Sequence, residues 1–599
     1  MKAKDWLSPL VIAAIGLVLG LTGIGWGLPS ARRVALLGES VTKARAELGA
    51  RTSRELETRR EHAAILATQP AEEQFDPPRM VRRYLLFSDS PDEPLTLMAL
   101  AKMRPRQLDF NPRMVEYGGL HVYGAGAAMT LAHALGLGRI AGDVTHYADH
   151  PGHMAGLYVA GRCLMVLYNV GIALLLFFFA RSIASAIPQS EFRISHSLCG
   201  WAAALIWLLS QPSLAFSHIV NPHLPSAFYG TLAAWLAWKA AANGRWIAAS
   251  GGDSSSIDSS STQPPSRPEV AIHPRAWLGA AAACGAAAAC ALSAAVSFLM
   301  LPAVALFTAY ALENRQKSEP QQDDGWRSDL GLLKKFCAAA ARPVGLALLM
   351  AAAFYLAFNP YVWVNLDVLR EEWARFHEFR EPQATAVSVI AYGLVTLPDA
   401  LGLIAVVVAV FGAVTLWKSS AAGRAMVSYA GVALVLAACL AGSGAREALT
   451  VRFAMFLLPL LCVFAAVALT GPWPRVVRIL GAVFVVLGLV GATAVYLASF
   501  MQSPRDDGGA FINRELPASS VVLAPKSPGP YKTPAFDFSR LRLVSDPKAP
   551  HDFVVQVEDR RPPATPAGFE LMAEFPKEGM LPPTPLSFSG RLVRIYRKK

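Results

Sequence analysis

Long apolar segments recur along most of the 599-residue chain and are separated by shorter polar connections. An α-helix needs about 20 mostly apolar residues to cross the hydrocarbon core of a bilayer. The pattern predicts about eleven such helices within residues 1–500, so the expected fold class is an all-α polytopic membrane protein. The predicted spans are residues 6–28, 157–180, 196–217, 226–242, two within 276–312, 344–358, 401–417, 425–440, 453–469 and 479–500.

Residues 276–312 form an apolar run that is too long for one ordinary helix, and Ser293 and Ser297 lie at its middle. If this run were one tilted helix, every later connection would lie on the opposite side of the membrane. Two short spans joined by a turn keep the basic residues of the later connections on the same side as the earlier ones, as the positive-inside rule demands. We therefore predict the split.

The first span follows Lys2 and Lys4, and basic flanks favour the cytoplasmic side of a membrane. No clear small-x-small cleavage site follows it, so we expect a retained anchor with a cytoplasmic N-terminus rather than a removed signal peptide. An odd number of spans then places the C-terminus outside.

Three segments are not predicted to cross the membrane. Residues 29–154 form a long first external loop whose apolar, glycine-rich stretch is expected to lie along or dip into the membrane surface. Residues 243–275 are rich in Ser, Pro and Gly and are expected to be a disordered cytoplasmic linker. Residues 501–599 begin with a helical stretch and continue with five strand-like runs, which predicts a small external α/β domain.

The composition supports a membrane protein, because 54% of the residues are hydrophobic and only 16% are charged. The formal charge of +12 would suggest nucleic acid in a soluble protein, but Lys and Arg cluster at the ends of the apolar segments. That distribution is typical of signals that set membrane topology. We expect membrane lipids, and no nucleic acid, as partners.

The stretch SDSPDEPLTL, just beyond the first span, contains candidate catalytic residues. Ser90 as N-cap, Pro91 at the first helical position and Glu93 three residues after the cap would form a capping box, which needs no catalysis. Asp92 has no role in such a cap. We therefore select Asp92 as a catalytic carboxylate, with Glu93 as either a second one or the cap residue.

Further polar residues are expected on the same outer face as Asp92. Arg452 stands at the outer end of an apolar span, where it either reaches the lipid headgroups or clamps a phosphate with its planar guanidinium. The histidines match no metal-ligand spacing, so we select no metal-binding residues; the cofactor is unknown, and the sequence leaves open whether a divalent metal takes part. The candidate substrate-binding residues are Arg452, Arg446, Asn221, His223 and Tyr361.

The order of these parts resembles the GT-C superfamily of integral-membrane glycosyltransferases, and in particular the protein O-mannosyltransferase and aminoarabinose-transferase families. The resemblance covers roughly residues 1–500. The stretches that carry it are SPDEPLTLMALAKM, GRCLMVLYNVGIALLLFFFAR, FSHIVNPHLPSAFYGTLAAWLAW, FNPYVWVNLDVLREEW and VRFAMFLLPLL.

The resemblance implies transfer of a sugar from a polyprenyl-phosphate donor to a glycan, lipid or protein acceptor on the outer face of a bacterial inner membrane. Asp92 would act as the general base, and Arg452 would stabilise the departing phosphate. Such families often have another Asp at the second outer turn, where this chain has Asn221 and His223.

Two other classes remain open from the sequence. A transporter or flippase would carry charged residues within its spans, and few are present. A non-enzymatic envelope assembly protein would use the C-terminal domain for docking.

Overall fold

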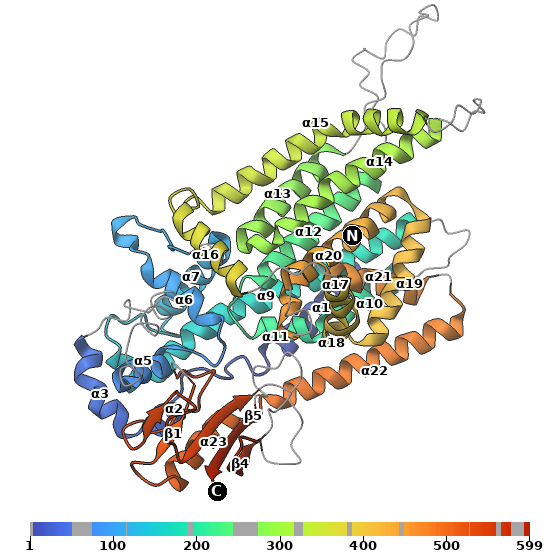
Figure 1. The fold of residues 1–599 in the computed structure, drawn as a ribbon. Helices are drawn as coiled ribbons and strands as arrows, with labels where there is room; N and C mark the ends of the chain where they lie inside the picture. Colours follow the sequence, from blue (N-terminus) through green and yellow to red (C-terminus); the bar gives the residue numbers. More distant parts are fainter. Residues whose placement is uncertain are drawn as a thin grey trace, which may run out of the picture.

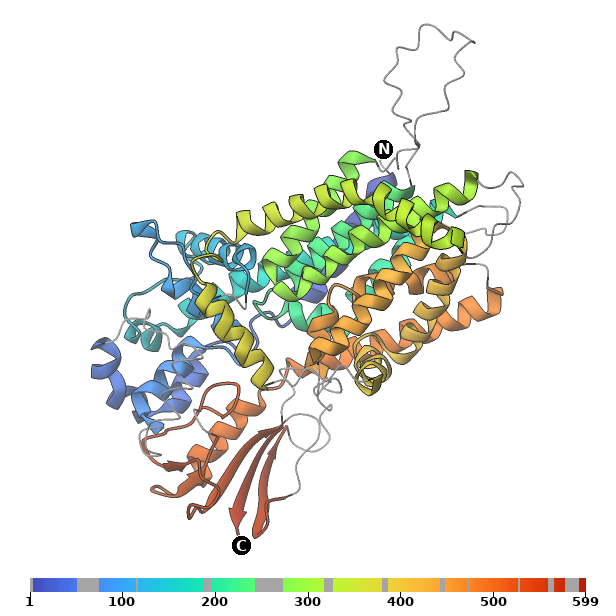
Figure 2. The same cartoon turned by 45° about the horizontal axis from the view of Figure 1, so that its top comes forward.

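The computed structural model shows a helical bundle, a group of helices from the first loop and a small C-terminal sheet (Figure 1 and Figure 2). The described residues are 4–50, 75–114, 117–187, 196–242, 273–316, 327–379, 386–441, 448–471, 473–525, 528–558, 565–576 and 592–599. Most of the predicted linker therefore lies outside the described residues.

The bundle consists of long, mostly apolar helices around one hydrophobic core. The helices are α1 (Lys4–Leu21), α9 (Pro151–Ala186), α10 (His196–Leu208), α11 (Gln211–Ser217), α12 (His223–Ala242), α13 (Pro274–Cys290), α14 (Met300–Gln316), α15 (Arg327–Phe358), α17 (Ala386–Ala391), α18 (Leu397–Leu401), α19 (Leu403–Ser419), α20 (Ala421–Ala441), α21 (Leu458–Thr470) and α22 (Arg475–Ser499). Short π and 3-10 turns occur at η4 (Tyr392–Thr396) and η6 (Ala448–Ala454).

Among the described residues, five helices are long and apolar enough to cross a membrane, or up to seven if each bent pair counts as one span. One bent pair is α10 with α11, at 57°, and the other joins the helix ending at Leu401 to α19, at 111°. The protein is thus a multi-pass membrane protein, whereas the expected number of eleven spans is not confirmed.

The predicted break within residues 276–312 is confirmed. Helix α13 ends at Cys290, Ala291 is extended, and the 3-10 segment η3 (Leu292–Leu299) leads into α14. Gly118 packs against this break, since its amide donates to the Cys290 carbonyl at 2.9 Å and a Cβ there would lie 2.0 Å from the Ala289 oxygen.

The described residues of the first loop are mostly helical. Its glycine-rich stretch forms one continuous helix, α7, that packs against α9 and α13. The glycines do not interrupt it because they allow close contacts, as between Gly126 and Leu100. The loop helices are α2 (Ala31–Leu37), α3 (Glu39–Ala50), α5 (Pro77–Leu86), α6 (Glu93–Lys102), η2 (Pro105–Gln107), α7 (Gly119–Ala134) and α8 (Thr145–Asp149).

The C-terminal unit contains the predicted helix and all five predicted strands. Helix α23 (Pro504–Glu515) packs on one five-stranded sheet with the order β2-β1-β3-β5-β4. Strand β1 pairs in parallel with β2 and β3, and β5 pairs antiparallel with β3 and β4. The strands are β1 (Val521–Leu523), β2 (Arg542–Val544), β3 (Phe553–Glu558), β4 (Phe569–Phe575) and β5 (Leu592–Lys598).

The C-terminal unit and the first loop share one hydrophobic core. Leu37 and Leu85 from the loop belong to the same buried cluster as Ile512, Val593 and Ile595. Figure 1 and Figure 2 show α2 and α3 beside the sheet and α23. The segments 29–154 and 501–599, which the sequence suggested as separate parts, therefore pack as one structure at one end of the bundle.

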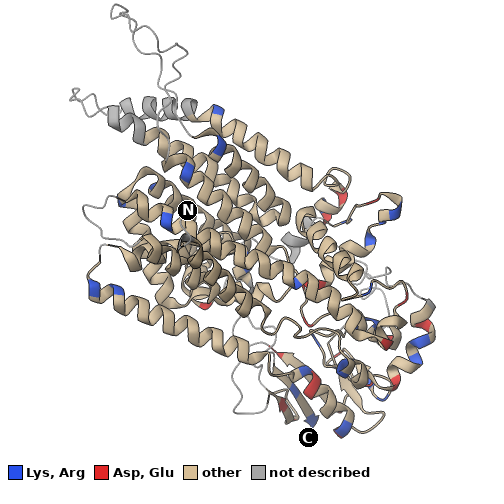
Figure 3. Ribbon diagram, turned by 180° about the vertical axis from the view of Figure 1, so that it is seen from behind, with Lys and Arg blue, Asp and Glu red and all other residues tan. Residues whose placement is uncertain are grey.

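The opposite end of the bundle is rich in basic residues. Figure 3 shows most Lys and Arg of the bundle at the helix ends that lie away from the C-terminal unit. Arg475 and Arg478, for example, begin α22, whose other end leads into α23.

Candidate active site

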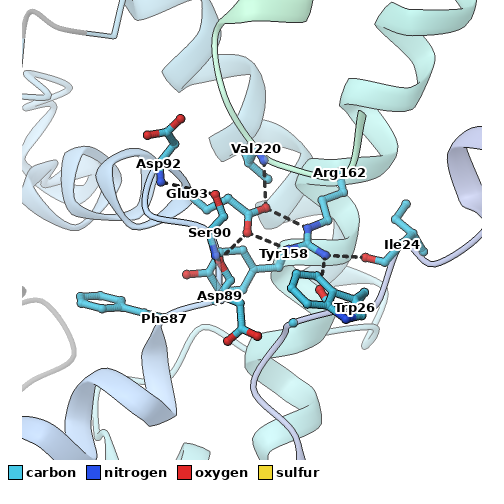
Figure 4. A network of polar contacts seen from close by, with 12 residues as sticks. Ile24, Trp26, Phe87, Asp89, Ser90, Asp92, Glu93, Tyr158, Arg162 and Val220 are labelled. Atoms are coloured by element: carbon cyan, nitrogen blue, oxygen red, sulfur yellow. Dashed lines mark hydrogen bonds and ion pairs between the residues drawn. The ribbon is translucent and has the colours of Figure 1, made fainter. Parts of the chain in front are cut away.

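The acidic stretch that the sequence singled out forms the short connection between α5 and α6. Helix α6 begins at Glu93, so Asp92 occupies the N-cap position, and its side chain makes no capping hydrogen bond. The predicted capping box is wrong: the Glu93 carboxylate does not return to Ser90 but turns into the protein interior. Three carboxylates in five residues therefore point in three different directions (Figure 4).

Glu93 forms a buried ion pair with Arg162 of α9. Arg162 Nε donates to Glu93 Oε1 at 2.8 Å and Nη2 donates to Oε2 at 2.7 Å, and both side chains are at most 1% exposed. The Val220 amide and the Ser88 hydroxyl also donate to this carboxylate. All directions around Glu93 are thus occupied by donors of the protein itself.

Arg162 also fixes the end of the first span. Its Nη1 donates to the carbonyl oxygens of Ile24 and Trp26, each at 2.7 Å. A charged residue inside a long apolar helix is costly unless it is paired, and here two carboxylate bonds and two carbonyl bonds satisfy it. The sequence had not suggested Arg162 as part of the site.

Asp89 forms a second buried cluster with two arginines. Arg33 Nη2 donates to Asp89 Oδ1 at 2.6 Å, and Arg505 Nη1 donates to Oδ2 at 2.9 Å. The three side chains are between 5% and 8% exposed. Arg33 belongs to α2 and Arg505 to α23, so this carboxylate joins the acidic stretch to the C-terminal unit.

Asp92 differs from both neighbours because no arginine encloses it. Figure 4 shows its carboxylate pointing away from the Glu93–Arg162 pair. It forms an ion pair with Arg452 of η6, whose Nη1 lies 3.9 Å from Asp92 Oδ2. Arg452 is 30% exposed and Asp92 13%. The structure therefore brings together two of the residues that the sequence had selected, at a place that solvent reaches.

Asn221 and His223 lie at the turn before α12 and are buried. Asn221 Oδ1 accepts the His223 amide at 3.1 Å, and its Nδ2 has no hydrogen-bond partner among the described residues. Electrostatic interactions connect His223 with Arg452 and with His121. Of these two predicted binding residues, His223 therefore lies within electrostatic reach of Arg452.

His121 of α7 is a further buried group that the sequence did not single out for this site. Its Nε2 shares a hydrogen bond of 3.1 Å with the Thr96 hydroxyl, while Nδ1 has no partner among the described residues. The ring of Tyr117 packs edge-on against it, and the Tyr117 hydroxyl contacts the Asp92 carbonyl.

Tyr361 lies in a different place. It lines a pocket between the first loop and the helices α13 and α15, together with Gly118, Tyr123, Asn359 and Asn365. Its hydroxyl accepts the Phe110 amide at 3.3 Å. Arg446 lies outside the described residues.

The described part of the chain contains no group of three or more His, Cys, Asp or Glu arranged to hold a metal ion. His146, His150 and His153 do gather, with ring centroids 5.0 to 5.2 Å apart. However, His146 Nε2 and His153 Nδ1 share a hydrogen bond of 2.8 Å, so these nitrogens face each other rather than a common point.

No family model and no curated protein sequence matches the chain. Solved structures of two proteins are similar to it at 12 to 13% sequence identity. ArnT from Cupriavidus metallidurans, bound to undecaprenyl phosphate, matches 85% of this chain and 70% of its own, with a TM-score of 0.39 and 13% identity. The Archaeoglobus fulgidus oligosaccharyltransferase in its apo form matches 84% of this chain and 70% of its own, with a TM-score of 0.40 and 12% identity.

At these TM-scores the likeness is too loose to assign a family or an activity to this chain.

Proposed function

We propose that the protein is an integral-membrane glycosyltransferase that moves a sugar from a polyprenyl-phosphate carrier to an acceptor hydroxyl or amine. The observation that carries this proposal is the Asp92 carboxylate, which faces the Arg452 guanidinium at 3.9 Å while both neighbouring carboxylates are enclosed by buried arginines. The acceptor is a glycan, a lipid or a protein.

The chemistry follows from the two opposite charges. An acceptor O–H or N–H attacks the anomeric carbon of the donor, the bond from that carbon to the phosphate oxygen breaks, and Asp92 takes the proton of the nucleophile. The departing polyprenyl phosphate gains negative charge. Arg452 stabilises that charge with a planar donor pair suited to phosphate oxygens.

The other residues receive supporting roles in this proposal. Glu93 positions α6 through Arg162 and takes no proton, because its four hydrogen bonds leave no room for a substrate atom. Asn221 and His223 bind polar groups of the sugar in this proposal, since His223 interacts with Arg452 and the Asn221 Nδ2 has no hydrogen-bond partner among the described residues. Tyr361 and Arg446 remain predicted binding residues.

We place the site on the outer face of a bacterial inner membrane, with the N-terminus in the cytoplasm. The basic residues at the bundle end away from the C-terminal unit support this orientation, because Lys and Arg favour the cytoplasmic side. A transporter would use a free charge within a membrane-spanning helix, whereas the guanidinium of Arg162 in α9 is buried and fully paired.

The test uses purified protein, labelled polyprenyl-phosphate sugars and membrane extract as a source of acceptor. The wild type should transfer or hydrolyse the sugar, and Asp92→Asn should lower the rate by about 10²- to 10⁴-fold, the usual contribution of a general base. Asp149→Asn is the matched control, because Asp149 is half exposed and pairs with Arg45 of the same loop. Wild-type activity in Asp92→Asn contradicts the assigned base, and no turnover of any donor by the wild type contradicts the proposed function.

A further inference from the structure

Two sets of buried ion pairs fix the acidic stretch, one on each side of Asp92, and we call each set an anchor. One of the two anchors includes a residue near the C-terminal end of the chain. Arg162 of the bundle holds Glu93, one residue after Asp92. Arg33 and Arg505 hold Asp89, three residues before it. Asp92 thus lies between two buried carboxylates that are both fixed by arginines from other elements.

The second anchor reaches the backbone as well as the side chain. The Asp89 amide donates to the Gly27 carbonyl at 2.8 Å, and Arg33 donates to the carbonyls of Gly27 and Phe87. Gly27 has a φ of 67°, and a Cβ there would lie 2.9 Å from the Asp89 Cβ. The connection therefore has little space to shift while Asp89 keeps its partners.

Arg505 joins this anchor to the C-terminal unit. It belongs to the first turn of α23, and its guanidinium also lies over the Trp26 ring, 5.8 Å from the centroid. The Trp26 indole donates to the Gln502 carbonyl at 3.3 Å. Helix α23 in turn packs against β4 and β5, so the sheet supports the residue that holds Asp89.

We propose that Asp89 is a positioning residue through which Arg505 and the C-terminal unit fix Asp92 opposite Arg452. This inference rests on the proposed function, because it assigns the C-terminal unit a part in the same reaction. Asp89 contacts no reacting atom in this proposal. It acts by keeping the backbone of residues 88–92 in one place.

The physical reason is the small tolerance of a catalytic group for displacement. A shift of about 1 Å in a reacting group, caused by a change outside the chemistry, costs on the order of 10²-fold in rate. A buried carboxylate that loses one of its two arginines, or a buried arginine that loses its carboxylate, moves toward other partners or water. The connection between α5 and α6, which contains both Asp89 and Asp92, is only a few residues long, so Asp92 would move when Asp89 moves.

The first experiment compares Asp89→Asn, Arg505→Gln and the double variant by steady-state kinetics with the labelled donor. Each single variant should lower kcat by about 10²-fold with less than a threefold change in the donor KM, because Arg452 is untouched. The double variant should lose no more kcat than Asp89→Asn, since the two residues act through one another. The proposal is overturned if the kcat loss of the double variant equals the product of the two single losses. It is also overturned if Asp89→Asn keeps the wild-type kcat.

The matched control is Asp537→Asn. Asp537 is also a buried carboxylate of the shared core, and it binds Ser40 and Ser539 without contacting the acidic stretch. It should lower thermal stability while leaving kcat near the wild-type value. Arg505→Lys keeps the positive charge beside Asp89, so we expect it to fold more readily and to retain a higher kcat than Arg505→Gln. Equal kcat losses in the two Arg505 variants would count against a role of the ion pair.

Amide hydrogen exchange separates this proposal from the proposed function. Asp89→Asn should speed exchange at residues 88–92 by at least tenfold, whereas Asp537→Asn should not, and neither result depends on any catalysed reaction. Faster exchange in a protein without transferase activity supports the anchor and contradicts the function. Unchanged exchange in Asp89→Asn contradicts the anchor itself.

Discussion

Asp92 Oδ2 and Arg452 Nη1 lie 3.9 Å apart, although the two residues come from the first loop and from the segment before α21. A partly exposed pair at this distance contributes little to stability, about 1 kcal/mol or less. Their mutual contact therefore adds little to the stability of the fold. A weak pair of this kind can separate at little cost, so that each residue contacts the substrate instead.

Replacing Arg452 by Lys should weaken binding of the donor. Lysine keeps the charge but loses the planar pair of donors that matches phosphate oxygens, so we expect about tenfold weaker binding and an unchanged melting temperature. Titration with a non-hydrolysable polyprenyl phosphate measures the dissociation constant. Arg475→Lys, at the exposed start of α22, is the control, and equal affinities in the two variants would remove Arg452 from the phosphate site.

Glu93→Gln should destabilise the protein strongly. The change leaves the Arg162 guanidinium buried without its carboxylate, and breaking a buried ion pair in this way costs about 3–5 kcal/mol. Glu570→Gln breaks an exposed pair with Arg597 and should cost less than about 1 kcal/mol. Thermal unfolding in detergent compares the two, and similar losses would show that the Glu93 pair is not a structural anchor.

The region around α8 should lose stability in mild acid. Burial, and then the charges of Arg139, His153 and His150, lower the pKa of His146 below its usual 6.5, while Asp143 acts in the opposite sense. The folded state therefore binds fewer protons at this site than the unfolded state, and stability falls as the pH drops through about 6.5.

His146→Asn should reduce this pH dependence. Hydrogen exchange of α8 between pH 8 and pH 5 measures the effect, with His551→Asn as a control in the C-terminal unit. The interpretation fails if the wild type and His146→Asn show the same increase in exchange on acidification.

Gly509→Ala should disturb the packing of α23. A Cβ at residue 509 would lie 1.9 Å from the Ala535 carbonyl oxygen, so the helix must shift, at a cost of about 1–3 kcal/mol. Gly491→Ala in α22 is the opposite case, because no atom lies within 4 Å and alanine favours a helix. The melting temperature should fall for the first variant and stay level or rise for the second.

The sequence predicts those parts of the fold that depend on local patterns. Strand-like runs separated by Pro and Gly turns located all five strands of the C-terminal unit, and Ser293 with Ser297 located the break between α13 and α14. The shared core was not predictable in this way, because Leu85 and Val593 are each ordinary apolar residues whose contact depends on the complete fold.

The candidate site was predictable in part. Asp92 stood out because the predicted cap did not need it, and Arg452 because it stands at the outer end of an apolar span; the structure brings the two together. Glu93 was misread because a capping box depends on spacing alone, whereas its real partner, Arg162, lies on another helix. The position of Arg162 within the apolar sequence of α9 was a usable signal, since such a charge needs a buried partner.

The shared core has a consequence for the order in which the chain is made. Synthesis proceeds from the N-terminus, so α2, α3 and α5 emerge long before α23 and the strands that cover them. Until the last strand, β5, has been completed and moved to the same side of the membrane, Leu37 and Leu85 lack the apolar partners Ile512 and Val593. Biogenesis of this protein therefore calls for protection of the first loop while the remaining helices are inserted.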